Sequence, residues 1–236
     1  YFQATRGGGN GDYNVIVLAP NSVQEMADFV DLAFELAFKY RNPVMILSDG
    51  VIGQMMEKVV LPPFKSRRTE EEVRKECPWA TMGRTKDREP NILTSLELKP
   101  EVMELRNIHL QEKYQTIRDN EVRYEAQQCD DADYIIVSFG SAARIGEKAV
   151  ELARAEGIKV GLFRPITLWP FPSKEIAAAA KGKKGILVSE INAGQMIQDV
   201  KLAVNGALPV EHFGRLGGIV PDPEEIVNVL KDKLMR

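Results

Sequence analysis

The stretch 163–172, FRPITLWPFP, holds the side chain in this sequence best placed to do chemistry, Arg164. It follows an apolar run, residues 159–163, that has the length and composition of a buried strand. Because ligands and partner subunits meet parallel α/β sheets at the carboxyl ends of strands, an arginine fixed there could contact either. We favour the alternative, in which Arg164 makes a structural ion pair and its apolar neighbours are core residues: Leu168, Trp169 and Phe171.

A second candidate is the glycine-rich loop TRGGGNGD at residues 5–12. Glycine backbones can adopt positive φ angles and approach a partner closely. The spacing matches neither a dinucleotide fingerprint nor a P-loop, which ends in Gly-Lys-Ser/Thr. We therefore favour a flexible or partner-ordered loop over a phosphate site.

The cysteines and histidines of the chain are few. Cys77 and Cys129 lie far apart, which excludes an iron–sulfur cluster or a complete structural zinc site within this chain and indicates free thiols in a reducing compartment. His109 and His212 are expected to be surface or structural residues rather than catalysts.

The first 60 residues predict one β-α-β unit. Residues 14–19 and 44–47 read as buried strands, and Ser22 with Glu25 forms a capping-box signature for a helix that ends near Tyr40. Two strands and one helix cannot bury both faces of a sheet. We therefore expect this part to be the end of a domain whose earlier strands are missing or are replaced by another chain.

Residues 61–131 predict a long connector. Five prolines interrupt it between residues 62 and 100, and charges are dense and nearly balanced. Residues 100–128 have apolar positions at helical spacing, which predicts a long surface helix or a pair of helices. A loop of this length is uncommon in a compact monomer, so we expect it either to cover a site or to grip a partner.

Residues 132–236 predict a small doubly wound parallel α/β domain. Four apolar runs alternate with helical segments: 134–139, 159–163, 185–190 and 210–213. The turns at Gly140-Ser141 and at 192–194 place backbone N–H groups at helix starts, where an anion could bind. No lysine or acidic residue at nucleotide-site spacing accompanies them, so we favour purely structural turns.

Composition limits the class of protein. The 236 residues are 44% hydrophobic and 28% charged, and the net charge of −3 gives no electrostatic reason to expect nucleic acid. No apolar run approaches 18 residues and no signal-peptide pattern opens the chain, which predicts a cytoplasmic protein without a membrane segment. The start at Tyr1, without Met, suggests that the sequence is part of a longer polypeptide.

Taken together, six segments resemble the alpha subunit of 2-oxoacid:ferredoxin oxidoreductases, most closely the 2-ketoisovalerate and 2-oxoglutarate members. They are TRGGGNGDY (5–13), LAPNSVQEM (18–26), RNPVMILSDG (41–50), FRPITLWPFP (163–172), VSEINAGQM (188–196) and FGRLGG (213–218). The resemblance implies that residues 1–60 are the C-terminal part of a pyrimidine-binding domain of the thiamine enzymes. It also implies that 132–236 is a transketolase C-terminal-like domain, and the connector with the long helix, 61–131, lies between these two parts.

The chemistry implied by the resemblance is oxidative decarboxylation of a 2-oxoacid to its acyl-CoA, with electrons passing singly through iron–sulfur clusters to ferredoxin. Thiamine diphosphate with Mg²⁺ serves the full complex, and the clusters belong to other subunits. The implied partners are beta, gamma and ferredoxin-like delta subunits, with ferredoxin, the 2-oxoacid and coenzyme A; neither nucleic acid nor a membrane is expected.

This sequence lacks the family's thiamine-contacting Thr-Pro loop and its glutamate, and the diphosphate and metal site is expected in a partner subunit. We therefore expect no bound cofactor and no activity from this chain alone. The remaining candidates are Arg6 with Gly7, Gly8 and Gly9 as cofactor contacts at the active-site mouth, and Arg164 at an inter-domain or inter-subunit interface.

The alternative function is a non-catalytic subunit-assembly module whose connector wraps a partner. A transketolase-like or dehydrogenase fragment is disfavoured by FGRLGG and TRGGGNGDY.

Overall fold

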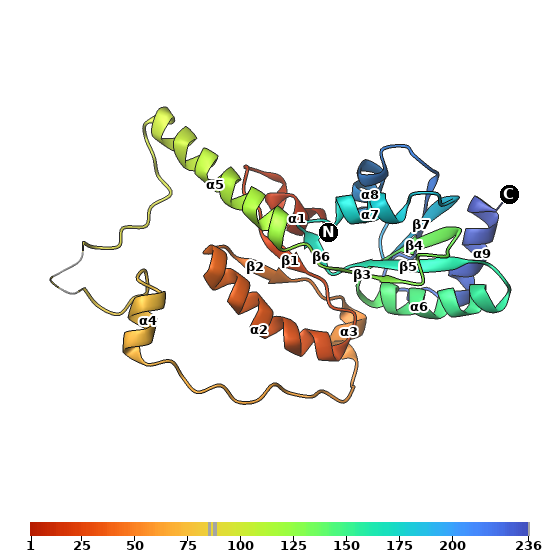
Figure 1. The fold of residues 1–236 in the computed structure, drawn as a ribbon, viewed down its shortest axis with the longest axis horizontal. Helices are drawn as coiled ribbons and strands as arrows, with labels where there is room; N and C mark the ends of the chain where they lie inside the picture. The colour runs from red at the N-terminus through yellow and green to blue at the C-terminus, as the bar shows by residue number, and fades with distance from the viewer. Residues whose placement is uncertain (85, 87–88, 236) are drawn as a thin grey trace. The chain divides into compact units, whose positions relative to one another are not determined.

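The computed structural model describes residues 1–84, 86 and 89–235 (Figure 1). These residues form two compact units, one made of residues 1–60 with 110–236 and the other of residues 61–109. Within the described residues, no helix is long and apolar enough to cross a membrane.

A small three-stranded sheet, in the order β2-β1-β6, contains the predicted β-α-β unit. The strands β1 (Ile16–Leu18) and β2 (Val44–Ile46) are parallel and are joined by helix α2 (Val23–Tyr40). The third strand, β6 (Thr167–Trp169), pairs antiparallel with β1, although it lies about 150 residues later in the sequence. The strand was not predicted, because the prolines around it indicated that regular structure ends there.

Helix α2 begins as its sequence predicts, with one difference. The Ser22 hydroxyl accepts a hydrogen bond from the Glu25 backbone N–H at 3.2 Å, but the Glu25 carboxylate accepts from the N–H of Asn21, not from that of Ser22. The reciprocal half of the capping box is therefore displaced by one residue. Phe29 and Leu36 are the buried residues of the helix.

The second sheet has five strands in the order β3-β5-β4-β7-β8. Their bounds are β3 (Tyr124–Gln127), β4 (Tyr134–Val137), β5 (Val160–Pro165), β7 (Gly185–Glu190) and β8 (Val210–Gly214). The last four are parallel, as predicted, whereas β3 is an antiparallel edge strand on β5.

Helices cover both faces of this sheet, which makes the domain doubly wound (Figure 1). Helices α6 (Gly140–Ala155) and α9 (Pro223–Leu234) pack with the inward residues of one face. Helices α7 (Ser173–Ala179) and α8 (Met196–Val204) pack on the other face. Helix α9 starts with the predicted cap at Asp222, whose carboxylate accepts from the Glu224 N–H at 3.0 Å.

Short elements complete the larger unit. Helix α1 (Phe2–Thr5) leads into a 3₁₀ turn, η1 (Gly7–Gly9), and helix α3 (Gly50–Gln54) follows β2.

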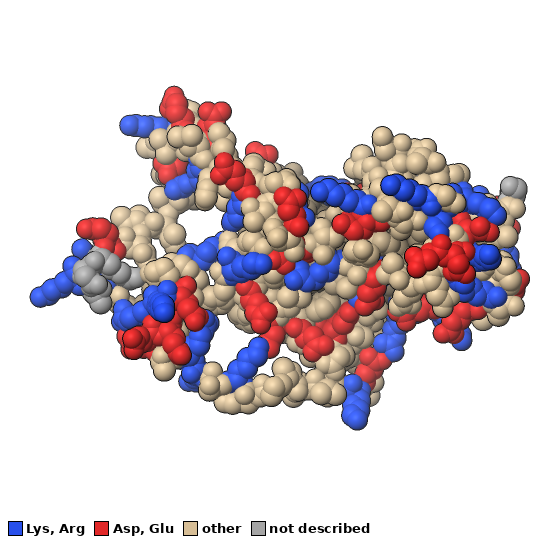
Figure 2. All heavy atoms as spheres, viewed as in Figure 1, with Lys and Arg blue, Asp and Glu red and all other residues tan. Residues whose placement is uncertain are grey.

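On the face in view in Figure 2, acidic and basic side chains are interspersed.

Among its described residues, the region predicted as a connector contains two helices. Helix α4 (Glu70–Glu76) has a full capping box between Thr69 and Glu72. Helix α5 (Pro100–Asn120) is the predicted long helix, but it ends at residue 120 and not near 128. The expected continuation is instead strand β3, which pairs its backbone with β5.

The smaller unit exposes large apolar side chains in a stretch without regular structure. Those most exposed within residues 90–99 are Ile92, Leu93, Leu96 and Leu98. Such side chains are typical of a segment that meets a partner. The expectation that this region covers a site or grips another chain stays a prediction.

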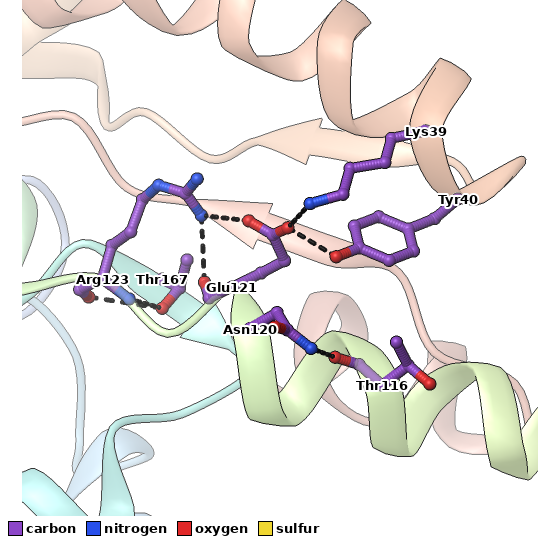
Figure 3. A network of polar contacts seen from close by, with 7 residues as sticks. All are labelled: Lys39, Tyr40, Thr116, Asn120, Glu121, Arg123 and Thr167. Carbon is purple, nitrogen blue, oxygen red and sulfur yellow. Dashed lines mark hydrogen bonds and ion pairs between the residues drawn. The ribbon is translucent and has the colours of Figure 1, made fainter.

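The carboxylate of Glu121 ties α2 to the turn between α5 and β3 (Figure 3). It accepts hydrogen bonds from Lys39 Nζ at 2.7 Å, from Tyr40 Oη at 2.5 Å and from Arg123 NH1 at 2.9 Å. Arg123 in turn meets β6, since its backbone N–H donates to Thr167 Oγ1 at 2.9 Å. The Glu121 side chain is 3% exposed, so these donors, and not water, stabilise its negative charge.

Burial alone would raise the pKa of Glu121, but the hydrogen bonds from Lys39, Tyr40 and Arg123 outweigh burial and hold it below its usual range. A carboxylate with a lowered pKa stabilises the fold above the pKa of the unfolded chain, and this stabilisation is lost as the pH falls through the folded pKa. The contribution of Glu121 is therefore present at neutral pH.

We expect Glu121→Gln to lower the free energy of unfolding by about 2 kcal/mol at pH 7, because three donors lose a buried, charged acceptor. The difference from wild type should shrink below about pH 4, where the unfolded carboxyl takes up its proton. Urea unfolding at both pH values measures it. The exposed Glu104→Gln is the control, and an equal loss at both pH values would contradict the assignment.

Candidate functional site

The glycine loop folds back on Tyr13. Gly7, Gly8 and Gly9 all have positive φ angles, of 58°, 67° and 84°. A Cβ atom at Gly7 would lie 2.6 Å from the Tyr13 carbonyl oxygen, so a larger residue there would displace the loop. The glycines therefore serve a tight backbone path.

Arg6 is held by an acidic side chain of α8. Its NH2 atom lies 2.6 Å from Asp199 Oδ1, and the Tyr1 hydroxyl donates to the other carboxylate oxygen. The arginine side chain is 41% exposed and that of Asp199 is 10% exposed. Asp199 thus anchors the loop from beneath while leaving part of the guanidinium at the surface.

Burial, with the neighbouring charge and hydrogen bond of Asp199, raises the pKa of Tyr1 above its usual value. The phenol therefore stays protonated and remains a donor to Asp199. The backbone N–H of Phe2 donates to Gln195 Oε1 at 3.2 Å, which adds a second link between this segment and the start of α8.

Arg6 of the glycine loop and residues 169–171, far apart in sequence, line one hollow of about 400 Å³. Gly7, Gly8 and Gly9 are not among the residues that line it. Its basic side chains are Arg6, Arg118 and Lys174, and its acidic side chains are Asp119, Glu175 and Asp199. The apolar wall is Trp169, Pro170 and Phe171. The Arg118 guanidinium carbon lies 5.5 Å from the Trp169 ring centroid, which is cation–π distance.

Arg164 does not line this hollow. It is 1% exposed, and its two terminal nitrogens lie 2.7 and 2.6 Å from the carboxylate oxygens of Glu25 on α2. Its Nε atom lies 3.0 Å from Glu125 of β3. Burial would lower the pKa of Arg164, but Glu25 and Glu125 outweigh it and raise the pKa, so the guanidinium stays charged.

Carboxylates of the chain itself fill the helix starts where an anion could bind. Glu190, at the end of β7, accepts from the backbone N–H groups of Met196 at 2.8 Å and Ile197 at 3.1 Å. Asp49 accepts from the Ser141 N–H at 2.8 Å, at the start of α6. The interpretation of these turns as structural agrees with this geometry.

The histidines and cysteines contribute no metal cluster: the described residues contain no group of three or more metal-binding side chains. Cys77 and Cys129 are free and buried. Burial raises the pKa of the Cys129 thiol to about 11, so it is neutral at pH 7. His212 Nε2 lies 3.8 Å from Glu190 Oε1, and burial lowers the pKa of His212.

Sequence reasoning missed the acidic residues that hold the site together. Asp199 lies inside a helix without any local motif, so its pairing with Arg6 has no signal in the sequence. Glu190 and Asp49 could have been found, because each is an acidic residue at the carboxyl end of a predicted strand and just before a turn.

We expect Asp199→Asn to loosen the loop, because a partly exposed ion pair with Arg6 contributes about 1 kcal/mol. Amide hydrogen exchange of residues 1–11, measured by mass spectrometry, should speed up by about fivefold. Gln198→Ala, an exposed change on the same helix, is the control. Unchanged exchange in Asp199→Asn would show that the ion pair does not anchor the loop.

Comparison with known proteins covers both parts of the chain. Residues 2–126, more than half of the chain, match the family described as pyruvate flavodoxin/ferredoxin oxidoreductase, thiamine diphosphate-binding. Residues 132–226 match pyruvate:ferredoxin oxidoreductase core domain II. The sequence is 44% identical to ketoisovalerate oxidoreductase subunit VorB of Methanothermobacter marburgensis, over 98% of this chain and 64% of the relative.

Two solved structures are also similar. The 2-oxoglutarate:ferredoxin oxidoreductase from Magnetococcus marinus, with 2-oxoglutarate, coenzyme A and succinyl-CoA bound, superposes with a TM-score of 0.74 and 25% identity. The match covers 99% of this chain and 44% of that chain. A split-gene transketolase, described as an inactive beta4 tetramer, matches at a TM-score of 0.52 and 14% identity, over 94% of this chain and 58% of that one. The second likeness supports the transketolase-like fold alone.

The chain spans about two thirds of the length of the curated relative, 64% of it. The six segments that suggested the resemblance are thus joined by similarity along almost the whole chain. This chain belongs to the family of thiamine diphosphate-dependent 2-oxoacid:ferredoxin oxidoreductase subunits.

Proposed function

We propose that this chain is part of the alpha subunit of an enzyme that oxidatively decarboxylates a 2-oxoacid to its acyl-CoA and reduces ferredoxin. The observation that carries the proposal is the 44% identity to a ketoisovalerate oxidoreductase subunit over 98% of the chain. The proposed partners are the beta, gamma and ferredoxin-like delta subunits.

The residues described do not fit a complete site for thiamine diphosphate and its metal. The two helix starts best placed for a diphosphate are filled by Asp49 and Glu190, and the described residues contain no cluster of three metal-binding side chains. We therefore assign the diphosphate, the Mg²⁺ ion and the iron–sulfur clusters to other parts of the complex.

Within that complex, Arg6 with Gly7, Gly8 and Gly9 would contribute to the mouth of the active site. The partly exposed guanidinium beside a hollow of about 400 Å³ supports this role, since it can donate to an anionic group of a cofactor or substrate. Asp199 would act as a positioning residue, because its carboxylate holds the Arg6 guanidinium at 2.6 Å and its side chain is 10% exposed, whereas that of Arg6 is 41% exposed.

We also propose the domain limits expected from the sequence: a pyrimidine-domain part at 1–60, a connector at 61–131 and a transketolase C-terminal-like domain at 132–236. The division between the two family matches, at residues 126 and 132, supports the last limit. Under these limits the last part of the connector, strand β3, contributes an edge strand to the second sheet through its pairing with β5.

The isolated chain should be inactive, and a reconstituted complex should reduce methyl viologen with a 2-oxoacid and coenzyme A. In that complex, we expect Arg6→Ala to lower kcat/KM by about tenfold, because one charged hydrogen bond at the site is lost. Lys148→Ala, an exposed change on α6 that removes only the surface pair with Glu151, is the control. Dye reduction by the isolated chain would contradict the assignment of the cofactor to partners.

The same assay separates the alternative function, a non-catalytic assembly module. Under that alternative, the complex would assemble and turn over equally well with Arg6→Ala, and variants in residues 92–98 would prevent assembly. The exposed apolar side chains of that stretch are the observation that favours this alternative.

Arg164 is proposed as an interface residue that joins the first 60 residues to the second sheet. Arg164→Lys keeps the charge but loses the two-point contact with Glu25, and should cost about 2 kcal/mol of unfolding free energy. Thermal and urea unfolding of the chain measure this. If Arg164→Lys unfolds like wild type, the two-point contact is not what joins these parts.

A further inference from the structure

A trough of about 550 Å³ lies between strand β3 and helix α7, beside the hollow that contains Arg6. Helices α7 and α8 pack on the inward residues of the parallel strands, and the core on that face includes no residue of β3. The trough is lined by Tyr124, Ala126, Cys129, Asp130, Phe163, Lys174, Glu175, Ala178, Ala179, Lys181 and Lys183.

The floor of the trough is flat and aromatic. The rings of Tyr124 and Phe163 stack with centroids 5.0 Å apart and planes 5° from parallel. Phe163 is buried, but Tyr124 is 44% exposed, so one aromatic side chain remains accessible. Ala126, Ala178 and Ala179 leave space around the rings, because their side chains end at Cβ.

The rim of the trough is basic. Lys183 Nζ is bound by the carbonyl oxygens of Cys129 at 2.6 Å and Asp130 at 3.0 Å, so its ammonium group is fixed in place. Lys174 and Lys181 make no side-chain hydrogen bond or ion pair within the part of the chain that the structure describes. Three lysines face two carboxylates, Asp130 and Glu175, which leaves a net positive rim.

We propose that this trough binds a nucleotide, with its base stacked on Tyr124 and its phosphate groups bound by Lys174 and Lys181. The volume lies within the range of small-molecule sites, and base stacking on an accessible tyrosine is a recurrent mode of recognition. Two unpaired ammonium groups beside an aromatic surface match a ligand that carries anionic charge next to a flat ring.

The ligand chemistry has two sources: a free adenine nucleotide, or the nucleotide portion of a larger cofactor such as coenzyme A. The proposed nucleotide binding can be tested separately from the proposed reaction, because ligand binding is measured without turnover. It is an exception to the expectation that this chain alone binds no cofactor.

Isothermal titration of the full chain with ADP, coenzyme A, adenosine and inorganic phosphate tests the proposal. We expect saturable binding of ADP, with adenosine and phosphate each at least about tenfold weaker, since each lacks one half of the recognised group. Coenzyme A binding more tightly than ADP identifies the larger cofactor as the source, whereas equal or weaker binding identifies a free nucleotide.

Variants assign the binding to the trough. The double change Lys174→Gln with Lys181→Gln should weaken ADP binding by at least about tenfold, and Tyr124→Ala also by about tenfold. Tyr124→Phe should bind like wild type, because it keeps the ring. Lys148→Gln is the matched control: Lys148 lies on α6, across the sheet, and pairs with Glu151.

Circular dichroism and thermal unfolding establish that each variant is folded before its affinity is compared. The proposal is overturned if neither ADP nor coenzyme A binds, or if phosphate alone binds as tightly as ADP. It is also overturned if the lysine and tyrosine variants bind ADP as the Lys148→Gln control does.

Discussion

The buried charge of Arg164 is the constraint on which the arrangement of the larger unit depends. A guanidinium that is 1% exposed is unfavourable unless carboxylates surround it, and its partners come from two other elements, Glu25 on α2 and Glu125 on β3. The contact therefore holds α2, β3 and β5 together. Since Glu25 also accepts from the Asn21 N–H, the same carboxylate ties the start of α2 to the second sheet.

Strand β6 strengthens this link, because the chain passes from β5 in the large sheet directly to β6 in the small one. Glu121 acts at the opposite end of α2, where it binds Lys39 and Tyr40 and, through Arg123, meets Thr167. The two ends of one helix are thus fastened by two networks of ion pairs, one around the buried Arg164 and the other around the buried Glu121. Both networks use residues that are more than 80 positions apart in the sequence.

Much of the fold could be predicted because its signals are local. The apolar runs, the Ser22 cap and the Asp222 cap predict elements that the structure contains within a few residues. Strands β3 and β6 could not be predicted this way, since both are short and depend on pairing with distant strands. Residues 124–127 belong to the stretch whose apolar spacing predicted a helix. They form strand β3 instead, because their backbone pairs with the edge of β5.

The same limit applies to the candidate site. The glycine loop and residues 163–172 were singled out by composition, and one part of each, Arg6 and residues 169–171, lines one hollow. Asp199, which holds Arg6, is 193 positions away from it, and no periodicity or motif marks such a pair. The preference for a structural ion pair at Arg164 followed from a general cost, that of an unpaired buried charge, and needed no knowledge of the partner.

The segment at residues 163–172 leads into helix α7, which borders both the Arg6 hollow and the β3 trough. Pro172 is the N-cap of α7, and the helix spans seven residues before the turn that leads to β7. A helix of about 10 Å in length leaves part of the adjoining sheet face uncovered. The Arg6 hollow and the β3 trough both border α7, and they share Lys174 and Glu175 from its first turn. The segment that joins the two sheets therefore also leads into the helix that separates these two cavities.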